Sequence, residues 1–187
     1  MFSKKFDLTN VLAGCQRGRS GSQRKLYEHF YGYAMSICLR YTHCREEAAE
    51  ILNDTFFKVL TQVDRYDPAY PFRPWLRRIL INTAIDYHRR AHLLPTHEVL
   101  DERLMVCAEE MPMPHLNDTE DVLPILQQLS PAYRLVFNLS VMEGYRHQEI
   151  AEMLGISVST SRANLVRAKH KLRELMLARH PHLTKTD

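Results

Sequence analysis

The chain has 187 residues, of which 45% are hydrophobic and 25% are charged, so its composition is that of a folded protein and excludes wholesale disorder. The formal net charge of +3 is too small to indicate a polyanionic partner by itself. Only six glycines are available for tight turns, no apolar run approaches the length of a membrane span, and the four cysteines lack metal-ligand or disulfide spacing. We therefore expect an all-α, cytoplasmic protein that needs no metal or cofactor and does not insert into a membrane.

Helical periodicity dominates the first half of the chain. Apolar residues recur at three- and four-residue steps in segments that predict helices at about residues 8–14, 22–41, 45–60 and 74–90. Ser22 is expected to cap the second of these helices, and Pro74 to occupy the first turn of the fourth. Between the third and fourth helices, residues 64–74 contain three prolines and three aromatic residues, which exclude a helix and predict a loop.

The second half begins with a segment that lacks periodicity. Residues 92–119 combine prolines with acidic side chains and predict a flexible acidic linker. Helical patterns then resume at Glu120 and again after the cap signal Ser130-Pro131. Two further helical segments follow, one before and one after Gly155. The expected architecture is two small helical domains, at residues 1–91 and 120–187, of which the second is a helix-turn-helix.

Basic residues concentrate in two of the predicted helices. Residues 72–90 carry five arginines against one acid, and residues 162–173 carry three arginines and two lysines without an acid. Segregated positive charge of this kind predicts two surfaces for a polyanion, and the acidic linker separates them.

The clearest motif is the helix-turn-helix between residues 147 and 171. Ile150, Ala151 and Leu154 predict the inward face of its first helix, and Gly155 permits a left-handed turn. The exposed face of the second helix is expected to enter a DNA major groove. The residues expected to contact DNA there are Thr160, Arg162, Ala163, Asn164, Arg167 and Lys171. The alternative is that the basic residues only form the solvated side of a C-terminal helix.

The aromatic loop indicates which kind of ligand the first domain binds. Tyr66 and Phe72 lie directly before an arginine-rich helix, and unpaired nucleic acid requires stacking surfaces together with phosphate neutralisation. Strand-separated DNA is therefore a candidate ligand. Alternatively, the large aromatic residues fill the core, which we expect for Trp75.

Two longer segments resemble a known family. Residues 49–60 (AEILNDTFFKVL) and 75–90 (WLRRILINTAIDYHRR) resemble the second conserved region of extracytoplasmic-function sigma factors, and the segment that starts with LSPAYR at residue 129 resembles their fourth region. The resemblance implies a protein that is not an enzyme. It implies instead a subunit that binds core RNA polymerase and directs promoter binding, strand opening and transcription initiation.

The resemblance also implies residue roles. The helix with Asn53, Asp54 and Phe57 would dock on the clamp coiled coil of the largest polymerase subunit, and the fourth region on the flap of the second subunit. The second region would bind and melt the minus-ten element through Tyr66, Phe72, Arg73, Arg77, Arg78, Asn82, Arg89 and Arg90. The helix-turn-helix would bind the minus-thirty-five element. An anti-sigma factor, which can be membrane-bound, is a further partner that the family allows for.

Three alternatives remain open at this point. Phe56 and Phe57 are adjacent and cannot share one helix face, so Phe57 is either an exposed partner-binding residue or buried with Phe56 between two neighbouring helices. The chain could be a stand-alone helix-turn-helix regulator, although this leaves the aromatic loop unexplained. A nucleic-acid-processing enzyme that uses His and Glu is the third, but the histidines show no metal-ligand or triad spacing.

Overall fold

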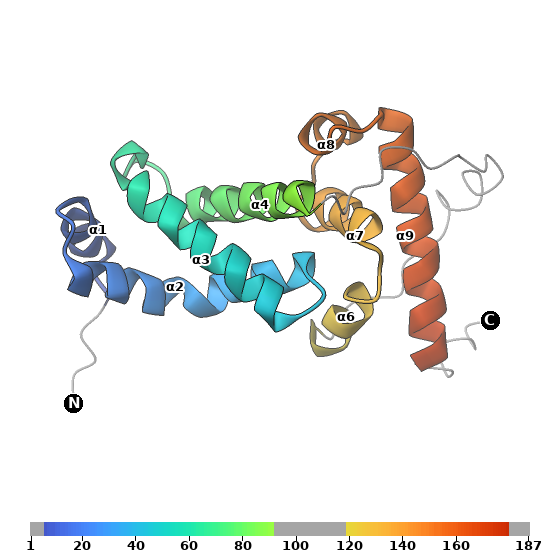
Figure 1. The fold of residues 1–187 in the computed structure, drawn as a ribbon, viewed down its shortest axis with the longest axis horizontal. Helices are drawn as coiled ribbons and strands as arrows, with labels where there is room; N and C mark the ends of the chain where they lie inside the picture. The colour runs from blue at the N-terminus through green and yellow to red at the C-terminus, as the bar shows by residue number, and fades with distance from the viewer. Residues whose placement is uncertain (1–5, 92–118, 180–187) are drawn as a thin grey trace. The chain divides into compact units, whose positions relative to one another are not determined.

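The computed structural model describes residues 6–91 and 119–179, and these ranges contain helices and no β-strand (Figure 1). The all-α prediction is therefore confirmed. Internal contacts divide the chain into two compact units. The first consists of Met1–Cys38 and Arg45–Ala84, and the second of Leu39–Cys44 and Ile85–Asp187. Residues 92–118 of the predicted linker lie outside the described residues.

The first unit is built from four α-helices and one short 3-10 turn. They are α1 (Leu8–Gln16), α2 (Ser20–Tyr41), α3 (Arg45–Thr61), η1 (Val63–Arg65) and α4 (Phe72–Arg90), except that the last residues of α2 and α4 belong to the second unit. The core between these helices is filled by side chains from α2, α3 and α4. Its fully buried members include Leu26, Ile51 and Leu76, each with at most 1% of its surface exposed.

Helix α1 is held at both ends. The Asp7 carboxylate accepts a hydrogen bond of 3.1 Å from the Asn10 amide and caps the helix, and Gly18 follows it with a φ of +68°. Helix α2 then begins at Ser20, two residues before the predicted cap at Ser22. The reason is that helical hydrogen bonding starts directly after the Gly18 turn, where the Arg19 carbonyl accepts from the Gln23 amide.

The second unit contains Leu39–Cys44, the end of α4 from Ile85 on, and the helices of the C-terminal half. These helices are α6 (Thr119–Leu126), α7 (Pro131–Phe137), the π-helical turn η2 (Asn138–Met142), α8 (His147–Leu154) and α9 (Val158–Arg179). Their core is formed by Ile125, Leu126, Leu129, Phe137, Ala168, Leu172 and Met176. The predicted cap is confirmed, because the Ser130 hydroxyl accepts from the Tyr133 amide and Pro131 takes the first helical position.

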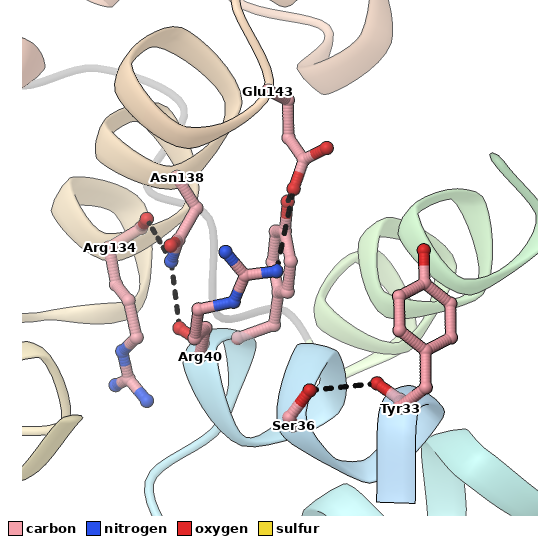
Figure 2. Close-up of polar contacts among 7 residues, drawn as sticks. Tyr33, Ser36, Arg40, Arg134, Asn138 and Glu143 are labelled. Atoms are coloured by element: carbon pink, nitrogen blue, oxygen red, sulfur yellow. Dashed lines mark hydrogen bonds and ion pairs between the residues drawn. The ribbon is translucent and has the colours of Figure 1, made fainter. Parts of the chain in front are cut away.

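A buried amide organises the start of the π-helical turn. Asn138 is fully buried, and its side-chain Nδ2 donates to the carbonyl oxygens of Arg134, at 2.9 Å, and of Arg40, at 2.7 Å (Figure 2). The η2 turn carries a backbone bond from Glu143 N–H to the Asn138 carbonyl, five residues back. Such a wide turn is rare and holds the buried amide in place within the second unit.

Two of the three free cysteines in the described ranges are inaccessible. Cys15 and Cys38 are buried in the first unit, whereas Cys44 is exposed. Burial raises the pKa of the Cys38 thiol to about 12 and also raises the pKa of Cys15, since a thiolate loses solvation in an apolar environment. No helix in the same ranges has the length and apolar character needed to cross a membrane.

Candidate nucleic-acid interface

The helix-turn-helix is formed by α8, a tight turn and α9 (Figure 1). Ile150, Ala151 and Leu154 are buried, as predicted for the inward face of the first helix. Gly155 adopts a left-handed conformation with φ +69° and ψ +34°, and its amide donates to the Ala151 carbonyl. The turn therefore needs a residue without a Cβ at this position, which confirms the predicted role of Gly155.

Side-chain hydrogen bonds fix the start of α9. The Ser157 hydroxyl accepts from the Thr160 amide at 2.9 Å and so caps the helix. His147, at the start of α8, lies with Nδ1 2.9 Å from the hydroxyl of the buried Ser161. This contact joins the two helices of the motif. Partial burial lowers the pKa of His147, and the positive charges of Arg162 and Lys169 lower it further.

The exposed face of α9 differs in part from the prediction. Arg162 and Lys171 are exposed, and Thr160 and Arg167 are half-buried, so these side chains reach the surface. Lys171 also pairs with Glu174 at 3.0 Å.

Two residues predicted on that face are inside instead. Ala163 is 4% exposed and Asn164 is 5% exposed, so the expectation that they face solvent is wrong. The physical reason is helical spacing, because Asn164 follows Ser161 by three residues and precedes Ala168 by four, which places it on the buried stripe.

The aromatic loop of the first unit leads into a cluster of rings. The Phe72 ring lies 4.8 Å from that of Phe30, and the Trp75 ring lies 5.4 Å from Phe72 and 5.3 Å from Tyr66. Phe72 is only 3% exposed, whereas Trp75 is half-buried. The two residues thus exchange their predicted positions, because the sequence predicts Trp75 in the core and Phe72 on the DNA-binding surface. The cause is the helix start, because α4 begins at Phe72 and not at Pro74, and this turns the Phe72 ring toward α2.

Two local hydrogen bonds shape the loop itself. The Tyr66 hydroxyl donates to the Tyr70 carbonyl oxygen at 2.6 Å, and the Asp67 carboxylate accepts from the Ala69 amide at 2.9 Å. Tyr66 is half-buried, while the Tyr70 side chain is 69% exposed. The loop is therefore an ordered turn that presents one tyrosine to solvent and one at its edge.

Helix α4 carries polar and basic side chains away from its buried stripe. Arg73, Arg78, Asn82, Arg89 and Arg90 are exposed, and Arg77 is half-buried. Arg78 and Asn82 are four residues apart and therefore share one face of the helix. The Arg73 guanidinium lies 5.3 Å from the centre of the Tyr33 ring, a cation–π contact that holds it against α2.

Helix α3 presents an unusual apolar residue to solvent. Phe57 is 70% exposed, whereas the adjacent Phe56 is 4% exposed and packs its ring 4.7 Å from that of Tyr27. The alternative in which both rings are buried is therefore wrong. Asn53, one turn before Phe57, is exposed and accepts a hydrogen bond of 3.4 Å from the Tyr27 hydroxyl, and Asp54 is half-buried. Together they form a polar rim around one exposed aromatic ring.

Within the ranges that the structure covers, His, Cys, Asp and Glu residues form no group of three or more that could hold a metal ion. The arrangement thus offers surfaces for macromolecules: a helix-turn-helix, an aromatic loop before a basic helix, and an exposed phenylalanine with polar neighbours.

Comparison with known proteins matches two segments of the chain to family models. A model of sigma-70 region 2 matches residues 26–93, and a model of sigma-70 region 4 matches residues 120–172. These two matches together span more than half of the 187 residues.

Several curated proteins are similar over most of their length. The RNA polymerase sigma factor CarQ of Myxococcus xanthus is 29% identical over 164 residues, which cover 86% of this chain and 94% of CarQ. The RNA polymerase sigma factor YlaC of Bacillus subtilis is 29% identical over 155 residues, covering 81% and 90%. Among solved structures, CnrH in complex with the cytosolic domain of CnrY matches with a TM-score of 0.44 and 26% identity, covering 90% of this chain and 96% of CnrH.

Proposed function

Since this chain belongs to the sigma-70 family and is an RNA polymerase sigma factor of the extracytoplasmic-function type, we propose that its two units divide promoter recognition between them. As a sigma factor it directs promoter-specific transcription initiation. The match to region 2 also removes the reason to consider a stand-alone helix-turn-helix regulator. Sigma factors as a class are specificity subunits and not enzymes.

The second unit binds the duplex minus-thirty-five element through α9. The observation that supports this is the helix-turn-helix with an exposed basic face, which has the geometry for a major groove. Arg162 is the best candidate for reading a base, because it is exposed in the first turns of α9, and Thr160 and Arg167 flank it. Lys171 contacts phosphate. Ala163 and Asn164 are left out of this role because a buried side chain cannot reach a base edge.

The first unit binds the minus-ten element and stabilises its unpaired non-template strand. Tyr66 supplies a stacking surface at the loop edge, and Phe72 supports it from the core through the ring contact of 5.3 Å. The basic and polar side chains of α4 neutralise phosphates along the upstream edge of the element: Arg73, Arg77, Arg78, Asn82, Arg89 and Arg90.

Core polymerase binds the surface around Phe57. Phe57 is 70% exposed and lies beside the polar side chains of Asn53 and Asp54, and an aromatic ring in such a surrounding can anchor a partner. The proposed contact for Asn53, Asp54 and Phe57 is the clamp coiled coil of the largest subunit, and that for the second unit is the flap of the second-largest subunit. An anti-sigma factor is a further proposed partner, on the ground of family membership alone.

The decisive experiment is transcription in vitro with purified core polymerase on a pool of promoter fragments. Initiation at specific sites that requires the protein is the expected result. At limiting protein concentration Phe57→Ala should reduce it strongly, and Phe57→Leu should reduce it less. If core polymerase neither binds the protein nor initiates, and the protein alone protects a duplex site, the sigma function is wrong for this chain.

A further inference from the structure

A cavity in the first unit lies between α1 and the segment with the aromatic loop. Its volume is about 460 Å³, and one wall is formed by the α1 residues Leu8, Thr9, Leu12, Ala13 and Gln16. The other wall runs from Val63 through the loop to Phe72 and includes Tyr66 and Tyr70. The match to sigma-70 region 2 begins only at residue 26, so the α1 wall lies outside the matched segment. Its contribution does not follow from the family pattern.

The size and lining of the cavity suit one small planar group. Binding sites for small ligands have volumes of roughly 300–1,000 Å³, so the cavity accommodates a single base but no helix or duplex. Leucine and valine side chains provide apolar surface for the face of a ring. Thr9 and Gln16 are exposed and carry a hydroxyl and an amide, each of which both donates and accepts hydrogen bonds. These are the groups that an edge of a base requires.

The loop wall is ordered before any ligand binds. The Tyr66–Tyr70 hydrogen bond and the Asp67–Ala69 hydrogen bond close the loop on itself. Because the conformation is already fixed, a ligand that enters the cavity does not have to order the chain.

The α1 wall is held in place by a close helix contact. A Cβ atom added to Gly14 would lie 2.0 Å from the Ser22 hydroxyl oxygen and 2.6 Å from the Ser22 Cβ, so only glycine lets α1 approach the start of α2 this closely. At the other end, the Phe6 ring stacks on His29 of α2 at 3.5 Å. The position of α1, and with it the width of the cavity, therefore depends on Gly14.

Positive charge adjoins both walls. Arg17 directly follows Gln16 at the C-terminal end of α1, and Arg65 directly precedes Tyr66 in the loop wall. Both side chains are exposed, as are those of the neighbouring acids Asp7 and Asp64. The nearby Asp67 uses one carboxylate oxygen to hold the Ala69 amide. Because both arginines are exposed and next to the walls in the sequence, they are available to neutralise the phosphates that flank a bound base.

We propose that α1 forms the second wall of a site for one unpaired base of the promoter non-template strand, and that Thr9 and Gln16 determine which base it accepts. The proposal rests on the proposed sigma function and extends it to a helix outside the matched region. The loop supplies the stacking surface, and α1 supplies the selectivity.

The first test fills the cavity from the α1 side. Ala13→Leu adds bulk to the wall without changing the loop, and Asn10→Leu is the matched control, because Asn10 is exposed on the same helix and does not line the cavity. With holoenzyme and a promoter that carries 2-aminopurine in the minus-ten region, Ala13→Leu should slow strand opening about ten-fold or more, since the energy that offsets unstacking is lost. Duplex binding and core binding should not change. Equal opening rates for the two variants would overturn the proposal.

The second test measures base preference. A promoter library with randomised minus-ten positions is transcribed by holoenzyme that contains the wild type, Gln16→Ala or Thr9→Val. Each variant should reduce discrimination at one and the same position by roughly five-fold or more and leave the minus-thirty-five preference unchanged. An unchanged profile at every position, or a uniform loss across all positions, contradicts a base-reading role for α1.

The third test moves the wall through the Gly14 contact. Gly14→Ala should impair opening, and the double variant Gly14→Ala/Ser22→Gly should restore it, because the second change removes the atoms that the new Cβ meets. Gly21→Ala is the control, since a Cβ there meets nothing within 4 Å. No rescue in a variant that folds normally by circular dichroism counts against the proposal.

These outcomes distinguish a failure of the sigma function from a failure of the α1 site. If wild-type protein fails to support initiation with core polymerase, the sigma function itself is wrong. If wild-type protein initiates and all α1 variants match it in rate and base preference, the function stands and the α1 site does not exist.

Discussion

The hydroxyl of Tyr66 donates a 2.6 Å hydrogen bond to the carbonyl oxygen of Tyr70, so the aromatic loop is closed by one of its own side chains. The first prediction follows from this bond. Tyr66→Phe keeps the ring but loses the bond, and because the group is half-buried the free energy of unfolding should fall by no more than about 1 kcal/mol. Strand opening by the holoenzyme, followed by 2-aminopurine fluorescence, should slow because the loop loses its fixed shape.

Phe72→Ala provides the contrast to that variant. Removing a ring from a position that is 3% exposed should lower the free energy of unfolding by about 3–5 kcal/mol, measured by urea denaturation. If Tyr66→Phe destabilises the protein as much as Phe72→Ala does, an effect on opening would reflect unfolding and not the loop.

The adjacent phenylalanines of α3 give a second prediction. Phe57→Ala should change the free energy of unfolding by less than about 0.5 kcal/mol, since Phe57 is 70% exposed, yet weaken binding to core polymerase at least ten-fold. Phe56→Ala should cost about 3–5 kcal/mol of stability. Urea denaturation and a fluorescence-anisotropy titration with core polymerase measure the two effects, and unchanged affinity of Phe57→Ala would remove this surface from the interface.

A third prediction distinguishes residues of α9 that contact DNA bases from residues that stabilise the second unit. Arg162→Ala should cost about 1–3 kcal/mol of binding to the cognate minus-thirty-five duplex if Arg162 reads a base. The same loss on a scrambled duplex would identify a phosphate contact instead. Asn164→Ala should act mainly through the stability of the second unit, because Asn164 is 5% exposed, and a base-specific loss in that variant would show that the residue becomes accessible on DNA.

The fourth prediction concerns pH and the contact between His147 and Ser161. Burial, and then Arg162 and Lys169, lower the pKa of His147, so the folded state favours the neutral ring. The unfolded chain therefore binds more protons between the lowered folded pKa and the unfolded value near 6.5. The stabilising contribution is complete above about pH 6.5 and is lost as the pH falls through the folded pKa.

The measurement compares wild type with His147→Gln, since other histidines titrate in the same range. The difference between their free energies of unfolding, obtained by urea denaturation from pH 7.5 to 5.5, should narrow toward acid if the neutral ring stabilises the motif. A constant difference across this range would show that His147 titrates alike in both states.

Local signals in the sequence predicted several features correctly. The cap at Ser130, the first-turn position of Pro131 and the left-handed Gly155 depend on the backbone within a few residues, and the structure confirms all three. The helical character of both halves follows equally well from periodicity.

Features that depend on distant neighbours were harder to predict. Whether Phe72 or Trp75 enters the core depends on where α4 begins and on the Phe30 ring, which lies more than forty residues away in the sequence. Asn164 is a different case, because its spacing from Ser161 and Ala168 contained the correct answer and its polarity suggested the wrong one. The cavity beside α1 could not be predicted, since it arises from two segments separated by about fifty residues.

The cysteines differ in burial, so their reactivity can be used to follow local unfolding of the first unit. Cys44 is exposed and should react with a thiol reagent in the native state, whereas Cys38 is buried and its pKa of about 12 keeps it protonated. Labelling of Cys38 therefore requires that α2 separates from the core, and its rate reports that local unfolding equilibrium. The rate of Cys38 alkylation, measured peptide by peptide, therefore reports opening of the first unit, and a ligand or partner that stabilises the unit should slow it.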